Sequence, residues 1–539
     1  MIRPRTALKV LVTLAALVLL LAISGHNYVE DIEIIDENSR EQQFIPPAMP
    51  QANSQINAAR PVPAVEKSLS ELETQIDLKQ AQLLDFLNGE DINSNQNVFG
   101  GSLSGMESPF DIKSTWDHVH QYATLILRKK YKKYKILDLS RRVRACLIAY
   151  TILYDKPLLV SSLSHDIEFL RNELKSIVDE LSFGSMTRLY PWISPRFDSV
   201  KAMQDYFFRP DISPLGIAFA AGKSQFILVL HSILTLRKVL NCTLPIEVHY
   251  LGPEDLPENM VATLNSMPGV RTVDLTQYFN RPTAWGWSIK PFAILAAGFR
   301  NVIFMDADTL FLKNPEIMVQ ESVIYQKTGQ LFFHDRSLPN GSSTEWFLRV
   351  NPVPTNYAMS LRYMKRLTYH EMESGVVVID KSKTSALHAL LLVCRMNSYA
   401  ERTTTDVYIH GDKETFWMSW DMTRTPYQFV PVFGSSIGYK NDHGKVCGGL
   451  LHVGEDLQPL WWNGGILTRK LNESYGFLSL GFIALDLTGE NIDWEVETES
   501  KPYCLGIKDS KNKIIKLGVK EKYLESIYRL LYEDLTRYG

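Results

Sequence analysis

From Pro214 onward, short apolar runs alternate with longer amphipathic ones, and this alternation restricts the fold more than any other feature. Strands that alternate with helices predict a parallel sheet covered by helices on both faces, as nucleotide-binding α/β folds have. The sequence contains no Gly-x-Gly-x-x-Gly and no P-loop motif, which excludes dinucleotide oxidoreductases and P-loop NTPases. We expect strands at 216–220, 246–251, 270–275 and 302–305, and helices at 223–240, 257–267 and 289–298.

The last of these strands runs directly into two carboxylates. In Val302-Ile-Phe-Met-Asp-Ala-Asp308, a buried strand would deliver Asp306 and Asp308 to the carboxyl edge of the sheet, where open α/β folds bind their ligands. Carboxylate oxygens suit Mg²⁺ or Mn²⁺, which complete their coordination with water and substrate phosphates. An Asp-x-Asp pair alone is weak evidence, so its context decides.

Three later stretches carry further polar groups next to apolar runs. Glu373 and Ser374 open the strand expected before Asp380. Each stretch has a plain alternative, such as a charged helix cap, a core histidine or a core aromatic pair, but together they predict one site. An imidazole ligand would favour Mn²⁺ over Mg²⁺. The groups from the other two stretches are Asp412 and Glu414 at an expected helix start, His452 at a strand end, and Trp461 with Trp462.

Lys290 lies sixteen residues before Asp306, at the start of the helix expected beside that strand. From there its ammonium group could reach the diphosphate of a nucleotide substrate bound through a cation at Asp306 and Asp308. The alternative is an ordinary surface cation at a helix start.

The N-terminus predicts the location of the chain. After Arg3, Arg5 and Lys9, residues 10–29 carry no charged side chain, which is long enough for a helix to span a bilayer. Basic residues on the N-terminal side place that end in the cytoplasm and the remainder in the lumen. A signal peptide cleaved after Ser24 is the alternative. Three glycosylation sequons, at Asn241, Asn340 and Asn472, agree with a lumenal chain.

Composition suggests how the rest is divided. The predicted parts are a cytoplasmic tail (1–9), a transmembrane anchor (10–29), a polar, proline-broken stalk (30–115), a helical subdomain (116–213) and a catalytic domain (214–539). Within the stalk, a capping box at Ser68 and a stop at Gly89 predict one short helix. The basic run 128–135 is best explained as a solvated helix face, since a lumenal chain meets no nucleic acid; docking to an anionic surface is the alternative. The five cysteines allow one or two disulfides whose pairing is open.

Several motifs resemble those of the fungal Golgi α-mannosyltransferases, which are type II membrane proteins. The resemblance covers roughly 214–476 and implies a GT-A glycosyltransferase that transfers mannose from GDP-mannose with retention, in α-1,3 linkage, to O- or N-linked mannan. Sister enzymes that make α-1,2 linkages share most of these motifs. The matching motifs are Gly216-Ile-Ala-Phe, Thr243-Leu-Pro-Ile-Glu-Val-His-Tyr-Leu, Trp287-Ser-Ile-Lys, Met305-Asp-Ala-Asp-Thr, Glu373-Ser-Gly, Gly411-Asp-Lys-Glu-Thr-Phe-Trp, Leu451-His-Val-Gly and Trp461-Trp-Asn.

The resemblance and the residue types together predict roles. A Mn²⁺ ion held by Asp306, Asp308 and His452 would neutralise charge on the departing diphosphate. The donor nucleotide-sugar would contact four residues within the motifs, Lys290, Ser374, Gly375 and Trp462. The remaining carboxylates, of Glu373, Asp412 and Glu414, are the candidates for holding mannose hydroxyls. Retention through an enzymatic nucleophile or by front-face attack stays open, and so does a non-catalytic lumenal carbohydrate-binding or scaffold protein.

Overall fold

A computed structural model describes most of the chain beyond residue 63. The predicted anchor, the basic run, and the sequons at Asn340 and Asn472 lie outside the described residues. Among the helices of the described part, none combines the length and the hydropathy that crossing a membrane requires. The described residues are 64–89, 113–117, 120, 136–163, 166–179, 190, 192–193, 196–279, 286–338, 342–468, 476–490, 492–496, 498 and 502–538.

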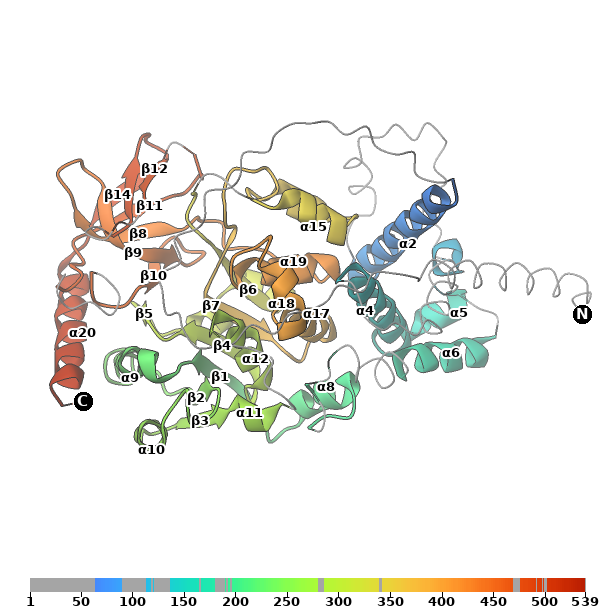
Figure 1. The fold of residues 1–539 in the computed structure, drawn as a ribbon, viewed down its shortest axis with the longest axis horizontal. Coiled ribbons are helices and arrows are strands. Elements are labelled where there is room, and N and C mark those ends of the chain that lie inside the picture. Colours follow the sequence, from blue (N-terminus) through green and yellow to red (C-terminus); the bar gives the residue numbers. More distant parts are fainter. Residues whose placement is uncertain are drawn as a thin grey trace, which may run out of the picture. The chain divides into compact units, whose positions relative to one another are not determined.

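A six-stranded sheet forms the centre, with the order β3-β2-β1-β4-β7-β6 (Figure 1). The first four strands are parallel, as the alternating sequence pattern predicted. The other two run antiparallel to their neighbours, which makes the sheet mixed. The strands are β1 (Ser213–Ala220), β2 (Ile246–Tyr250), β3 (Val270–Asp274), β4 (Phe299–Asp306), β6 (Gln330–His334) and β7 (Met372–Asp380).

Both faces of this sheet are buried, and β4 shows how. Val302 and Phe304 point into one hydrophobic core, while Ile303 and Met305 point into another. Successive side chains of a strand point to opposite faces, so a strand covered on both sides must be apolar throughout. The first core contains helices α12 (Ile289–Ala296), α17 (Thr384–Met396) and α19 (Lys413–Met422), and the second contains α9 (Phe226–Leu234).

A second sheet follows, most of which sequence reasoning missed. Strand β10 (Pro459–Asn463) pairs with β5 (Thr309–Phe311) and with β9, and so joins this sheet to the turn that carries Asp308. The C-terminal helix α20 (Val519–Tyr538) packs against α9. The His231 ring on α9 donates a hydrogen bond to the Tyr528 carbonyl on α20. The other strands are β8 (Ser435–Lys440), β9 (Val446–Val453), β11 (Phe482–Leu485), β12 (Ile492–Glu495), β13 (Cys504–Ile507) and β14 (Lys513–Lys516).

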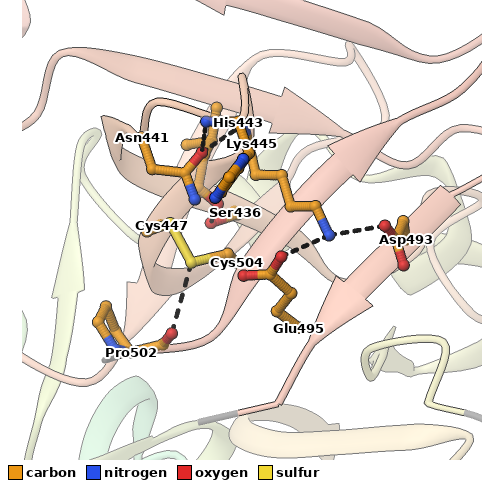
Figure 2. The surroundings of a disulfide bond; sticks show 10 residues. Ser436, Asn441, His443, Lys445, Cys447, Asp493, Glu495, Pro502 and Cys504 are labelled. Carbon is orange, nitrogen blue, oxygen red and sulfur yellow. Dashed lines mark hydrogen bonds and ion pairs between the residues drawn. A yellow bond between two sulfur atoms is a disulfide. The ribbon is translucent and has the colours of Figure 1, made fainter. Parts of the chain in front are cut away.

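One disulfide, Cys447–Cys504, ties β9 to β13, with the Cα atoms 4.0 Å apart (Figure 2). Lys445 reinforces the same region by pairing with Asp493 at 2.6 Å and Glu495 at 2.8 Å. The remaining three cysteines, Cys146, Cys242 and Cys394, are free and buried. Of the one or two disulfides that the sequence allowed, the structure therefore forms one.

The N-terminal helices form a cluster of their own. Helix α2 (Ala64–Asn88) is the predicted short helix, and Gly89 ends it with a φ of +77°, as expected. It is not part of an extended stalk, because it packs in the compact unit that begins at Pro63. Asp77 on α2 binds the arginines of α4, and this buried ion pairing is what the stalk prediction for 30–115 missed. The cluster also contains α4 (Ile136–Tyr150), α5 (Val160–Leu163) and α6 (Ile167–Asp179). Helix α8 (Val200–Phe208) packs instead in the first core of the central sheet.

Shorter helices complete the connections. The helix expected at 223–240 is interrupted at both ends, with a 3-10 turn at Lys223–Gln225 and a π turn at Thr235–Val239. The remaining α-helices are α10 (Glu258–Asn265), α11 (Leu275–Tyr278), α13 (Ile317–Gln320), α14 (Val323–Thr328), α15 (Thr344–Val350), α16 (Asn356–Ser360) and α18 (Tyr399–Thr405).

Candidate active site

The site is built around the end of β4. Asp306 is the last residue of this strand, and the turn behind it is held from two sides. Ser232 of α9 donates hydrogen bonds to the carbonyls of Ala307 and Thr309, at 2.8 and 2.9 Å. The amide of Gly465 donates to the Asp308 carbonyl at 2.7 Å. The backbone that presents the two carboxylates is therefore fixed before any ligand arrives.

Lys290 lies against this turn from the N-terminus of α12. Its ammonium nitrogen is 2.8 Å from Asp306 Oδ2, 3.2 Å from Ser374 Oγ and 3.9 Å from Asp412 Oδ1. Burial alone would lower the pKa of Lys290, but the surrounding carboxylates, Asp306 foremost, raise it above the usual lysine value. The lysine is thus a buried positive charge that joins three elements of the fold and is not a surface cation, while its contact with a diphosphate stays a prediction.

Asp306 is in a different electrostatic position. Burial raises the pKa of its carboxyl to about 6, and the charge of Asp308 adds to this, while Lys290 opposes it. Only 19% of the side chain is exposed. An added cation would relieve this cost, because the charge of Asp308 disfavours ionisation of Asp306.

A second group of charges borders the first. Lys413, at the start of α19, binds Glu373 Oε2 at 2.6 Å and Asp335 Oδ2 at 2.8 Å. Asn463 donates to Glu373 Oε1 at 3.0 Å, and so does the Gly375 amide at 2.7 Å. Burial would raise the pKa of Glu373, but Lys413 holds it below its usual range, so this carboxylate is ionised.

Glycine at 375 is required by this close packing. A Cβ atom there would come within 2.9 Å of both Asn463 Nδ2 and Glu373 Oε1. Gly375 therefore supports the Glu373 carboxylate and need not contact a substrate itself.

Asp412 is the most incompletely bonded carboxylate of the site. Its residue is 2% exposed, and its Oδ2 accepts no hydrogen bond from the described residues. It stands at the N-cap of α19 without making a capping bond. A buried carboxylate oxygen without a donor costs free energy, so such an atom is a candidate acceptor for a ligand hydroxyl.

Glu414 and Trp462 lie in the protein interior. Glu414 accepts hydrogen bonds from Trp417 Nε1 and from the Glu371 amide, and its Oε1 is 3.3 Å from His370 Nδ1. Trp462 is fully buried and donates to the Gly465 carbonyl at 2.8 Å, which holds the loop against Asp308. Both side chains shape the surroundings of the charged groups, and contact of either with a substrate stays a prediction.

His452 is surrounded by aromatic rings. It stacks on Trp461 at 4.0 Å and meets the edge of Phe333 at 5.4 Å. Burial lowers the pKa of this imidazole to about 3, and the carboxylates that act against this are those of Glu373 and Asp335. Its Nε2 is buried without a hydrogen-bond partner among the described residues. His452 is therefore neutral and lies on the Glu373 side of the site.

The donor set fits a divalent cation in part. Asp306 and Asp308 provide hard oxygens, and Asp306 carries an electrostatic cost that a cation would relieve. In the described part of the chain, no three His, Cys, Asp or Glu side chains gather as a ready ligand set. An ion held here would need water or substrate oxygens to complete its coordination.

Sequence reasoning missed three members of the site. Asp335 follows the apolar strand β6 in the way that Asp306 follows β4, which was a usable indication. Lys413 and Asn463 stood inside motifs already singled out, but their partners lie 40 to 90 residues away along the chain.

Comparisons with known proteins agree with the resemblance. Residues 215–454 match the family described as "Mannosyltransferase putative". "Putative alpha-1,3-mannosyltransferase MNN14" of Candida albicans is 26% identical over 330 residues, which cover 52% of this chain and 45% of the relative. Alpha-1,3-mannosyltransferase MNN1 of Saccharomyces cerevisiae is 25% identical over 316 residues, which cover 46% and 40%. The chain thus spans less than half the length of these relatives.

Among solved structures, the mannosyltransferase Ktr4p from S. cerevisiae aligns with 46% of this chain and 81% of its own, at 10% identity and a TM-score of 0.25. A similarity at this level carries no argument about function.

Proposed function

We propose that this chain belongs, through residues 215–454, to the fungal α-1,3-mannosyltransferase family. It transfers mannose from GDP-mannose to the end of a mannan chain in α-1,3 linkage. The fold would be of the GT-A type. The relatives' names support the linkage and the sugar, and the carboxyl edge of β4 supports a nucleotide-diphosphate donor.

The observation that carries the proposal is the contact of Lys290 with Asp306, Ser374 and Asp412. Carboxylates outnumber the cations here, since the site collects those of Asp306, Asp308, Asp335, Glu373 and Asp412 around Lys290, Lys413 and Arg336. A purely structural cluster would balance its charges, because buried unpaired charge is costly. The excess of negative charge supports binding of a cation together with the donor.

Each residue then has a chemical task. A divalent cation bound by Asp306 and Asp308 would supply charge neutralisation at the departing diphosphate. Lys290 adds a fixed positive charge beside it, and Ser374 orients that ammonium group. Asp412 Oδ2 is free to accept a hydrogen bond from a mannose hydroxyl, while Lys413 and Asn463 keep the Glu373 carboxylate in place for the same purpose.

The experiment is a donor and linkage assay on the full chain in detergent. GDP-mannose, UDP-galactose and UDP-glucose are each offered with Mn²⁺ and α-mannobiose, and the product linkage is determined. We expect transfer from GDP-mannose alone, with an α-1,3 product that disappears on chelation and returns with metal. Transfer from a UDP-sugar, an α-1,2 product, or no transfer from any donor would each refute the proposal.

A single-pass type II location in the Golgi membrane, with the catalytic domain in the lumen, is part of the same proposal. Residues 10–29 and the basic residues before them support it. In intact microsomes, added protease should leave the chain beyond Val29 protected and Asn-glycosylated. Degradation of that part, or a main product beginning near Gly25, would contradict the anchored topology.

A further inference from the structure

One large aromatic side chain near the site is exposed. Trp287 has 56% of its surface accessible, whereas five other tryptophans of the described chain, Trp192, Trp417, Trp420, Trp461 and Trp462, are almost completely buried. It belongs to the short 3-10 turn Gly286–Ser288 that leads into α12. An exposed indole is a costly surface feature unless something covers it, and tryptophan is enriched where proteins bind ligands.

The neighbours of Trp287 come from the loop before α19. The His410 ring forms a T-shaped contact with the indole, with the ring centroids 5.2 Å apart. Gly411 has a φ of +70°, and a Cβ atom there would lie 3.5 Å from the indole. His370 stands 6.2 Å behind His410, and its own Nδ1 is 3.3 Å from Glu414. The indole is thus held by neighbours from this loop, while 56% of its surface stays accessible.

Trp287 is directly connected to the charged site on both sides. Three residues after it comes Lys290, and the residue after its neighbour Gly411 is Asp412. At about 2 Å of rise per residue in a 3-10 turn, the backbones at 287 and 290 are separated by about 6 Å. A ring stacked on the indole would therefore be next to whatever Lys290 and Asp412 bind.

We propose that Trp287, with His410 beside it, is the acceptor subsite, and that the indole stacks against the pyranose ring of the mannan unit that receives the new sugar. This rests on the proposed function and identifies its second substrate site. A pyranose presents apolar C–H groups on its ring faces and hydroxyls around its rim, so it suits an aromatic plate with a polar neighbour. The imidazole of His410 provides that neighbour.

The donor nucleoside is the other flat group that could stack here, and the topology argues against it. A fold of this type binds its nucleotide in the crevice at the point where the strand order reverses, here between the carboxyl ends of β1 and β4. The ring contact of Trp287 comes instead from His410, in the segment before α19, and α19 packs against β7 on the other side of β4. We therefore assign Trp287 to the acceptor.

The test compares Trp287→Ala and Trp287→Phe with Tyr523→Ala, in which an aromatic side chain 64% exposed on α20 is removed far along the chain. Steady-state kinetics are measured on the full chain with GDP-mannose and α-mannobiose. We expect the KM for α-mannobiose to rise about tenfold or more in Trp287→Ala, the scale of losing one stacked aromatic contact. The phenylalanine variant should recover part of this loss, and the KM for GDP-mannose should stay within about twofold. Tyr523→Ala should match the parent.

Two results would overturn the assignment. A rise in the KM for GDP-mannose with the acceptor KM unchanged would show a nucleobase on the indole. Unchanged kinetics in both Trp287 variants would show that no substrate touches it. Binding of α-mannobiose without donor, followed by saturation-transfer NMR, keeps the inference testable if no donor supports turnover. Binding by the parent, its loss in Trp287→Ala and a weakened signal in Trp287→Phe, relative to Tyr523→Ala, would then support the subsite even though the proposed function had failed. Equal binding by all variants would refute it.

Discussion

Two buried polar clusters of this protein differ in how completely their charges are satisfied. At the junction of α2 and α4, Asp77 receives Arg141 Nε at 2.9 Å and Nη2 at 2.7 Å, and Arg144 Nη2 at 2.5 Å. At the end of β4, Lys290 contacts three partners, yet one oxygen of Asp412 has no donor among the residues that the structure describes. The first cluster is closed and holds helices together. The second is open, and a ligand could supply the missing hydrogen-bond donor.

Removing the centre of the closed cluster should have the largest effect on folding. Asp77→Ala leaves two buried guanidinium groups without their carboxylate, and breaking a buried pair in this way costs about 3–5 kcal/mol. Urea unfolding should show the loss. The matched control is Asp211→Ala, which removes an ion pair from the surface and should leave the midpoint unchanged. Equal midpoints for the two variants would show that the α2–α4 cluster contributes nothing to stability.

Asp308→Asn should separate function from stability in the open cluster. The variant keeps the shape of the side chain but removes one of two adjacent charges, so transfer should fall by about 10² to 10³, roughly 3–4 kcal/mol. The unfolding midpoint should stay the same or rise, because like charges no longer repel without a cation. kcat/KM is measured across a Mn²⁺ titration. Activity within a few-fold of the parent, with the same metal response, would make the carboxylate pair structural.

His452→Ala tests whether the histidine shares that task. If the imidazole acts on the same cation as Asp308, the double variant should lose much less than the product of the two single losses. Its position beside Trp461 and Phe333 gives the alternative, in which the loss is one of packing. In that case His452→Phe should regain the activity that His452→Ala loses. If the imidazole binds the cation, His452→Phe should stay as inactive as His452→Ala.

Asp412→Asn examines the unpartnered oxygen itself. If Oδ2 accepts a hydrogen bond from a substrate hydroxyl, the amide should lower kcat/KM by about 10- to 100-fold, the scale of about 1.5–3 kcal/mol for a bond to a charged group. The unfolding midpoint should not fall. A drop in stability with unchanged kinetics would show that Asp412 has a structural role, like Asp77, and does not bind substrate.

Two buried carboxyls whose pKa values are shifted in opposite directions, those of Asp306 and Glu247, should make the free energy of unfolding respond oppositely to pH. The pKa of Asp306, raised to about 6, exceeds its unfolded value near 4, so its contribution to stability is present below about pH 4 and lost as pH rises to about 6. Burial would raise the pKa of Glu247, but His249 and then Arg271 lower it to about 2. Its contribution to stability is therefore present above about pH 4 and lost as pH falls.

Urea midpoints from pH 2 to 7, in the presence of a chelator, measure both contributions. Asp306→Asn should remove a decline on the order of 1–2 kcal/mol between pH 4 and 6. Glu247→Gln should alter only the acid limb. If Asp306→Asn leaves the slope between pH 4 and 6 unchanged, the strained carboxyl is not Asp306.

The central sheet was predictable because its determinants are local. The apolar run before Asp306 requires burial on both faces wherever it folds, and the alternation with helices makes the first strands parallel. The same local reasoning found the end of α2 at Gly89. It could not give the antiparallel β6 and β7 or the second sheet, since strand order depends on pairings between distant segments.

The candidate site divides in the same way. By itself, the sequence determined that Asp306 and Asp308 end a buried strand and that Lys290 starts the preceding helix, because hydrophobic periodicity sets both positions. Only the tertiary structure decided which groups meet them. It brought Lys413 and Asn463 to Glu373, and Asp335 to Lys413. Glu414 accepts its hydrogen bonds from interior groups, whereas Asp412 Oδ2 has no donor among the described residues. Hydrogen bonds and ion pairs act over a few ångströms, so they are fixed by packing between segments that the sequence keeps far apart.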